Sequence, residues 1–193
     1  MQFPITIKGQ VFERMSDDEF FHFCQENSDT KFERNANGEI IIMSPTTFNT
    51  GDRNAEIITQ LRVWNKKHQL GRAVDSDTGF YLPNGAMRNP DAAWVSNELL
   101  KTLPESELDK FPRLTPEFVI ELKSKSDLLT SQQAKMGEWM ASGCQLGWLI
   151  DPEKQIVYIY SAGEITTISG FDQKLSGEPL LPGFELDLSE LIL

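Results

Sequence analysis

The segment from Glu117 to Ile150 constrains the fold of this 193-residue chain more than any other segment. Glu117–Lys123 is a short apolar run typical of a strand, and Thr130–Ser142 has helical periodicity and ends at Gly143. Leu146–Ile150 is a second apolar run. A strand, a helix and a strand in this order form a crossover unit, which places two parallel strands in one sheet. The segment therefore predicts an α/β fold with a mixed sheet flanked by helices.

Hairpins and further helices are predicted before this unit. A capping box, Ser16–Glu19, opens a helix that reaches about Asn27, and the turn Asn35–Gly38 joins two short strands. The longest helical pattern runs from about Asn49 to Gln69, with Gly71 as its stop. The remaining predicted strands are Phe3–Lys8, Ala73–Asp75, Gly79–Leu82, Ala92–Val95, Ile156–Tyr160 and Glu164–Ile168.

The end of the chain, with Pro179, Pro182 and Gly183, is expected to be rich in loops. No repeat, low-complexity segment or linker divides the sequence, so we predict a single domain over residues 1–193.

Composition excludes several classes of protein. Hydrophobic residues make up 39% of the chain, yet no apolar run approaches the roughly 20 residues that a membrane span needs. The first residues lack the basic and then apolar pattern of a secretory signal. Two cysteines, Cys24 and Cys144, are too few for a disulfide framework or a four-cysteine zinc site. We therefore expect a protein without membrane association, in a reducing cytoplasm.

The net charge of −11 opposes binding to a polyanion, because affinity for nucleic acid comes from Lys and Arg that neutralise phosphates. Positive charge is concentrated locally in the segment Arg53–Arg72, which also matches a solvated helix face. A protein that collects divalent metal needs a negative pocket and only a local basic rim, so the net charge does not exclude a nuclease.

The strand Phe118–Lys123 carries charge in a place that needs an explanation. Its period of two puts Val119, Glu121 and Lys123 on one face. Strands inside crossover units are buried on both faces, where unpaired charge is costly. A bound metal that takes Glu121 as a ligand, and leaves Lys123 to face the substrate, would account for the placement.

Asp91 follows Pro90 and precedes the strand Ala92–Val95. If that strand pairs with Glu117–Lys123, the carboxylates of Asp91 and Glu121 converge on one ion. Two carboxylates and the main-chain carbonyl of Leu122 would suit Mg²⁺ or Mn²⁺, which prefer oxygen ligands. Lys123 would then position or deprotonate the attacking water and offset charge on the phosphate.

An acidic residue two positions before Lys also occurs at Asp29–Lys31 and Asp172–Lys174. Only Glu121-Leu122-Lys123 ends an apolar strand, precedes a helix and has the Pro90-Asp91 pair upstream. The combination therefore singles out one of the three triplets.

With Pro90-Asp91 thirty residues before Glu121-Leu-Lys123, the sequence resembles the PD-(D/E)XK nuclease superfamily. It is also similar to a bacterial family of endonucleases called Uma-type, over roughly residues 45–160. The features that match are Glu56 on its helix, the segments 89–95, 116–124 and 143–152, and Lys135 with Trp139 on the next helix.

This resemblance implies a restriction-endonuclease-like core over about residues 45–160, with additional hairpin and meander strands. It also implies Mg²⁺-dependent hydrolysis of phosphodiester bonds. The resemblance also implies that Glu56 is a further carboxylate of the metal site and that Lys135 faces the site. A Tyr is more usual at the position of Trp139, so no hydroxyl is available there. DNA is the expected substrate, and a two-fold homodimer would suit cleavage of both strands.

Simpler interpretations remain open for the same residues. Taken alone, Glu121 and Lys123 could form an ion pair, Asp91 could be a turn residue, and Glu56 and Lys135 could be solvated helix residues. A non-catalytic module on the same fold, binding nucleic acid or a protein, and a phosphodiesterase acting on RNA or a small molecule are alternative functions. No Ser, Cys or His stands where a serine, cysteine or zinc hydrolase would need it.

Overall fold

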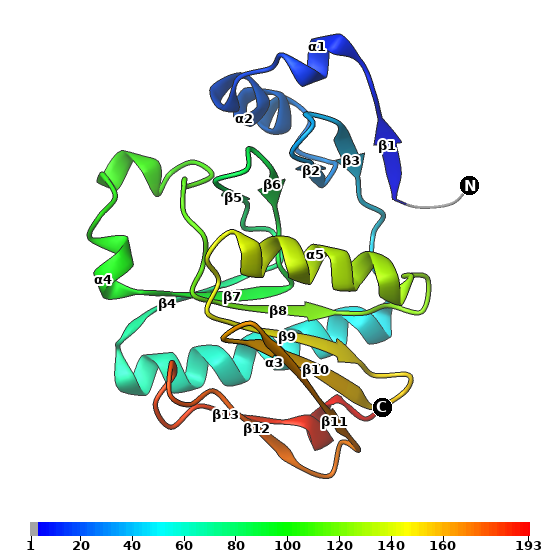
Figure 1. Cartoon of the computed structure of the whole chain (residues 1–193), viewed down its shortest axis with the longest axis vertical. Helices are drawn as coiled ribbons and strands as arrows, with labels where there is room; N and C mark the ends of the chain where they lie inside the picture. Colours follow the sequence, from blue (N-terminus) through cyan, green and yellow to red (C-terminus); the bar gives the residue numbers. More distant parts are fainter. Residues whose placement is uncertain (1–3) are drawn as a thin grey trace. The chain divides into compact units, whose positions relative to one another are not determined.

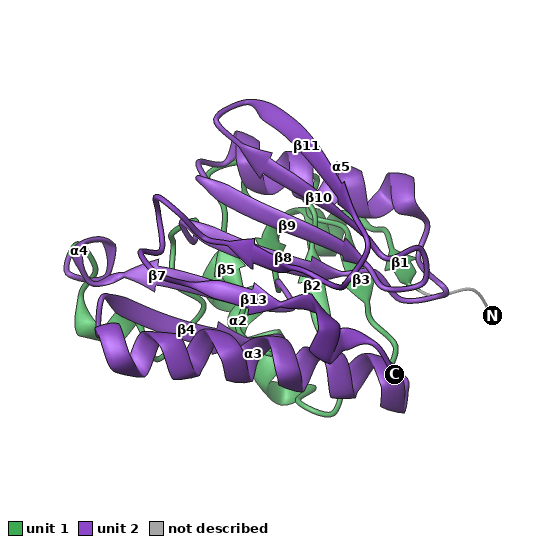
Figure 2. Cartoon of the chain, turned by 90° about the horizontal axis from the view of Figure 1, so that it is seen from below, with its two compact units in different colours: residues 1–45, 77–89, 102–115 green, residues 46–76, 90–101, 116–193 purple. Residues whose placement is uncertain are grey.

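The structure is a computed structural model that describes residues 4–193, so Phe3 of the predicted first strand lies outside the described residues (Figure 1). The chain forms two compact units, coloured separately in Figure 2. Unit 1 comprises residues 1–45, 77–89 and 102–115, and unit 2 comprises residues 46–76, 90–101 and 116–193. The single domain expected over residues 1–193 remains a prediction. No helix within residues 4–193 is both long and apolar enough to cross a membrane.

Unit 1 contains a five-stranded sheet in the order β1-β3-β2-β6-β5. The predicted capping box is confirmed, because the Ser16 side chain accepts from the Glu19 N–H and the Glu19 carboxylate accepts from the Ser16 N–H. The Asn35–Gly38 turn is also present, and Gly38 has a φ of 82° there, which favours glycine. The elements are β1 (Ile5–Ile7), α1 (Gln10–Glu13), α2 (Asp17–Glu26), β2 (Phe32–Arg34), β3 (Ile40–Ile42), β5 (Phe80–Tyr81), β6 (Met87–Arg88) and a 3-10 helix, η1 (Glu105–Glu107).

Unit 2 contains a six-stranded mixed sheet in the order β11-β10-β9-β8-β7-β4. The predicted crossover is confirmed, since β8 and β9 are parallel and α5 connects them, whereas the other neighbouring pairs are antiparallel. The strands are β4 (Gly71–Asp75), β7 (Ala92–Ser96), β8 (Phe118–Leu122), β9 (Leu146–Asp151), β10 (Ile156–Ser161) and β11 (Glu164–Ser169). The helices are α3 (Phe48–His68), α4 (Asn97–Leu100) and α5 (Leu129–Ala141).

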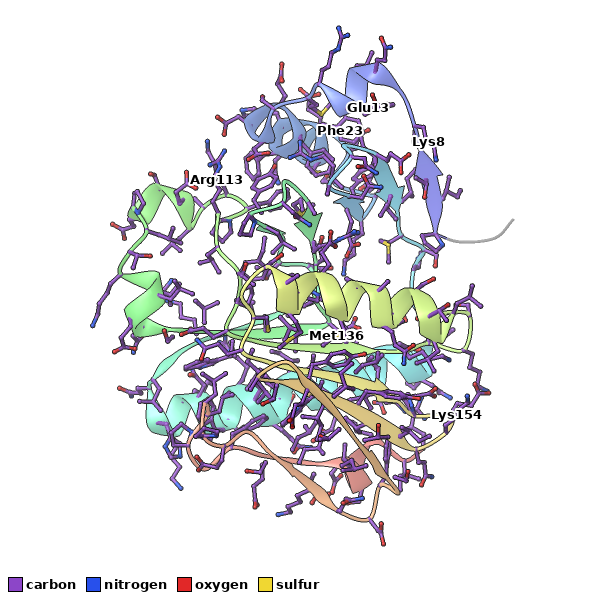
Figure 3. The ribbon with its side chains drawn as sticks, viewed as in Figure 1. Lys8, Glu13, Phe23, Arg113, Met136 and Lys154 are labelled. Carbon is purple, nitrogen blue, oxygen red and sulfur yellow. The ribbon has the colours of Figure 1, made fainter. Side chains whose placement is uncertain are left out.

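Helices α3 and α5 cover opposite faces of this sheet (Figures 1 and 2). Alternate residues of β8 explain the arrangement. Phe118, Ile120 and Leu122 share one core cluster with Ile57 and other apolar residues of α3. Val119 and Glu121 point to the other face, where α5 lies. On that helix Met136, labelled in Figure 3, is fully buried.

The end of the chain is rich in turns around Pro179, Pro182 and Gly183, as expected. It also forms short elements that were not predicted: β12 (Lys174–Ser176), β13 (Glu185–Asp187) and a 3-10 helix, η2 (Leu188–Leu191). Its apolar residues are buried in the core cluster that contains α3, and they include Phe171, Leu175, Leu181, Phe184, Leu186, Leu188 and Leu191. Phe184, Leu186 and Leu188 recur with a period of two, which is the pattern of a strand, and the prediction missed this short run.

The stop of α3 also differs from the prediction. The helix ends with Gln69 in the left-handed conformation, at a φ of 54°, whereas Gly71 is the first residue of β4. A Cβ atom on Gly71 would lie 2.2 Å from the main-chain oxygen of Val95. Gly71 is therefore suited to close contact between β4 and β7, and its flexibility does not end the helix.

Candidate active site

Strand β8 is buried on both faces and still carries a carboxylate. All five of its residues are buried, and Glu121 is 2% exposed. In register, Ala92 of β7 pairs with Ile120, and Leu122 pairs with Ile150 of β9. The strand thus brings the beginning of β7 and the end of β9 to the end of β8, where the predicted residues lie.

Asp91 lies where the pairing of β7 with β8 ends. Its Oδ2 accepts a hydrogen bond from the main-chain N–H of Leu122 at 2.7 Å. Because Lys123 donates its N–H to Ile150 of β9, alternation of the ladder turns the N–H and carbonyl of Leu122 toward the β7 side. The Asp91 carboxylate therefore lies beside the main chain of Leu122, the residue that follows Glu121. Convergence of the Asp91 and Glu121 carboxylates on one ion remains a prediction.

Glu121 contacts two side chains of α5. Lys135 Nζ lies 3.0 Å from Oε1 and 3.1 Å from Oε2, and the Trp139 indole N–H donates to Oε1 at 2.8 Å. The Lys135 side chain is 15% exposed and that of Glu121 is 3% exposed. Lys135 and Trp139 are four residues apart and share one side of α5. Lys135 therefore faces the carboxylate, as the resemblance implies.

Lys123 forms a separate ion pair with Asp151, the last residue of β9. Its Nζ lies 3.9 Å from Asp151 Oδ2 and donates to the main-chain oxygen of Ser124 at 3.1 Å. In the described part of the chain the ion pairs thus join Lys123 to Asp151 and Glu121 to Lys135. A simple pair between Glu121 and Lys123, the alternative left open by the sequence, does not occur among these residues.

Glu56 does not form a metal-holding group with Asp91 and Glu121, because no three acidic residues within residues 4–193 make such a group. Its Oε1 accepts from Gln60, which also contacts the main chain of Asp187. Asn54 contacts the site instead, because its amide donates to Asp91 Oδ1 at 3.3 Å. Two residues apart on a helix differ by about 200° in direction, so the two side chains leave α3 on nearly opposite sides.

The oxygen atoms around Asp91 suit a hard divalent cation. Within residues 4–193, no group of three or more His, Cys, Asp or Glu could hold a metal, so side-chain carboxylates alone do not make the site. The available donors are the Asp91 and Glu121 carboxylates and the Leu122 carbonyl. Asn54 Oδ1 is also buried and has no hydrogen-bond partner among the described residues. This donor set fits Mg²⁺ or Mn²⁺, which accept carboxylate, carbonyl and water oxygens.

Sequence reasoning missed Asn54, Asp151 and the contact of Trp139 with Glu121. Trp139 is 0% exposed, and its indole N–H donates to the Glu121 carboxylate. Its spacing from Lys135 was an available signal. Asp151 could also have been found, because two parallel strands end at the same edge of a sheet and a charged residue follows the apolar run of each. No pattern pointed to Asn54.

The two cysteines do not compete with this cluster as nucleophiles. Burial raises the pKa of both Cys24 and Cys144 to about 12, so neither is a thiolate near neutral pH. Part of the basic segment 53–72 serves the fold, since Arg53 donates to the Leu191 carbonyl and Arg62 to the Ala73 carbonyl. Lys66, Lys67 and Arg72 are exposed and form its accessible positive charge.

Comparison with known proteins gives two findings. A family model, Uma2, described as "Putative restriction endonuclease", matches residues 17–189. A crystal structure titled as a "putative nuclease belonging to DUF820" from Anabaena variabilis matches with a TM-score of 0.71 and 19% sequence identity. The match covers 84% of this chain and 90% of the other, and at this identity it shows the fold alone. No curated protein sequence matches.

Proposed function

Because the chain belongs to the Uma2 restriction endonuclease family, whose model matches residues 17–189, we propose that it is a metal-dependent endonuclease that hydrolyses phosphodiester bonds in DNA. The observation that carries the proposal is the grouping at the end of β8. The Asp91 carboxylate binds the Leu122 N–H, and Glu121 and Lys123 project from the same strand into a largely buried environment. Family membership implies nucleic acid as the substrate, and DNA and the metal are parts of the proposal.

Asp91, Glu121 and the Leu122 carbonyl would hold a Mg²⁺ or Mn²⁺ ion, with Asn54 Oδ1 as a further oxygen donor. When bound, such an ion polarises the phosphodiester and stabilises the charge that develops on it. Glu56, whose Oε1 accepts from Gln60, is left out of this proposed set because no three acidic residues within residues 4–193 form a metal-holding group.

The remaining residues supply positioning and charge. Lys123, whose ammonium lies at the end of β8, orients the attacking water and offsets negative charge on the phosphate. Asn54 holds the Asp91 carboxylate by its amide. Lys135 and Trp139 fix Glu121, and Lys135 neutralises its charge when no cation is bound.

A two-fold homodimer is part of the proposal, because each protomer would then cut one strand of a duplex. The exposed residues Lys66, Lys67 and Arg72 offer local positive charge for the phosphate backbone. Sedimentation of the purified protein measures the mass of the assembly.

The test is cleavage of supercoiled DNA, single-stranded DNA and RNA with Mg²⁺, Mn²⁺ or EDTA. Wild-type protein is compared with Lys123→Ala, Asp91→Asn and Lys125→Ala, all purified identically. Lys125 is exposed in the same loop and serves as the matched control for loss of a lysine. We expect cutting only with metal, loss of cutting in Lys123→Ala and Asp91→Asn, and wild-type cutting in Lys125→Ala. Equal activity in all four preparations would show a contaminant and refute the proposal.

The net charge of −11 favours a second candidate, a non-catalytic module that binds a basic protein partner. Calorimetry with Mn²⁺ on wild type and Asp91→Asn separates the two candidates. Metal binding that depends on Asp91, without cleavage of any nucleic acid, would favour the binding module.

A further inference from the structure

Asp151 is a fully buried carboxylate to which the proposed reaction gives no role. It is 0% exposed at the end of β9. Its Oδ1 accepts from the main-chain N–H of Lys154, labelled in Figure 3, on the turn after the strand. Its Oδ2 is buried and has no hydrogen-bond partner among the described residues. Because burial of an unpaired charge is strongly unfavourable, a carboxylate in this position needs a cation nearby.

Lys123 supplies that cation. Its Nζ lies 3.9 Å from Asp151 Oδ2, and the two side chains are 9% and 1% exposed. The pairing is set by the backbone, because Leu122 and Ile150 are partners in the parallel ladder and Lys123 and Asp151 follow them. The two side chains therefore leave the sheet next to each other on the same face.

We propose that Asp151 is a positioning residue that holds the ammonium group of Lys123 at the end of β8. The inference rests on the proposed function, in which Lys123 orients water and offsets charge on the phosphate. Asp151 itself contacts Lys123 and the following turn. The Lys123 ammonium therefore has one ion pair, with Asp151 at 3.9 Å, and one hydrogen bond, to the Ser124 carbonyl at 3.1 Å.

Asp151→Asn tests the proposal with little change of shape. The amide oxygen still accepts from the Lys154 N–H, whereas the charge that holds Lys123 is lost. A displacement of about 1 Å in a reacting group can cost about 10²-fold in rate, so we expect kcat to fall on the order of 10²-fold. The KM for DNA is expected to stay at its wild-type value, because Asp151 does not contact the substrate.

Glu153→Gln is the matched control. Glu153 is exposed on the same turn, and its substitution removes one negative charge without touching Lys123. We expect wild-type kcat for this variant. A loss in Glu153→Gln equal to that in Asp151→Asn would mean that net charge, and not the position of Lys123, sets the rate, and would overturn the proposal.

Thermal unfolding in EDTA supplies a readout that does not depend on cleavage. Wild type, Asp151→Asn, Lys123→Met and the double variant form a cycle. Removal of one partner leaves a buried charge unpaired, whereas removal of both leaves none. We therefore expect the double variant to have a higher Tm than either single variant.

The outcomes separate the two proposals. Additive losses of Tm would show that Asp151 does not act on Lys123 and would overturn the positioning role, whatever the wild type cleaves. A coupled cycle without cleavage by the wild type would support the placement of Lys123 and refute the nuclease function. Should Asp151→Asn fail to fold, the double variant decides, since its folding supports the pair and its failure to fold contradicts it.

Discussion

Lys135→Met is the perturbation whose effect follows most directly from the contacts of Glu121. Methionine keeps the apolar length of the side chain on α5 and removes the ammonium that lies 3.0 and 3.1 Å from the two carboxylate oxygens. Glu121 is 2% exposed, so water cannot replace the lost partner. Breaking a buried ion pair by removing one member costs about 3–5 kcal/mol.

The expected loss lies at the lower end of that range. The Trp139 N–H still donates to Oε1 at 2.8 Å and stabilises the remaining charge, so we expect a destabilisation of about 3 kcal/mol. For a chain of this size each kcal/mol lowers the Tm by about 2–4 °C, so the fall amounts to roughly 6–12 °C. Urea unfolding and thermal unfolding, both in EDTA, measure it.

Addition of Mn²⁺ provides a second test of the Lys135–Glu121 ion pair. If Glu121 is a ligand, added Mn²⁺ supplies the missing positive charge, and the Tm gained on adding Mn²⁺ should be larger in Lys135→Met than in wild type. Lys66→Met, at an exposed position of α3, is the control and should stay within about 0.5 kcal/mol of wild type. A loss below about 1 kcal/mol in Lys135→Met would refute the idea that this ion pair stabilises Glu121. An equal Mn²⁺ shift in both proteins would refute competition between Lys135 and the metal.

Two further perturbations test single contacts. Trp139→Phe should cost about 1.5–3 kcal/mol more in urea unfolding than Trp148→Phe, because both indoles are fully buried but only the Trp139 N–H bonds a carboxylate. Equal losses would contradict that contribution. Hydrogen bonds from the Ser16 side chain and N–H lower the pKa of Glu19 below its ordinary value of 4.5. Its ionised form therefore stabilises the fold above that pH, and the benefit is lost as pH falls through the lowered pKa. The Tm difference between wild type and Glu19→Gln should shrink below pH 4.5, and a difference independent of pH would contradict the assignment.

Local sequence patterns determined much of the sheet and the position of Asp91 beside β8. The alternation in Phe118–Lys123 and the helix after it required a parallel crossover, which β8, α5 and β9 confirm. The Pro90-Asp91 pair ahead of a short apolar strand placed Asp91 at the edge next to Leu122. These features were readable because a strand's period and the direction of a crossover depend on residues that are close in the sequence.

Only the tertiary structure decided which charges pair. The sequence shows Glu121 and Lys123 two residues apart, and the fold gives each a partner from a different element, Lys135 for Glu121 and Asp151 for Lys123. The rotation of α3 likewise brings Asn54 and not Glu56 to Asp91. The apolar residues at the end of the chain share one core cluster with residues of α3 and the sheet. Such choices depend on the distances and directions between elements, which a local pattern of residues does not contain.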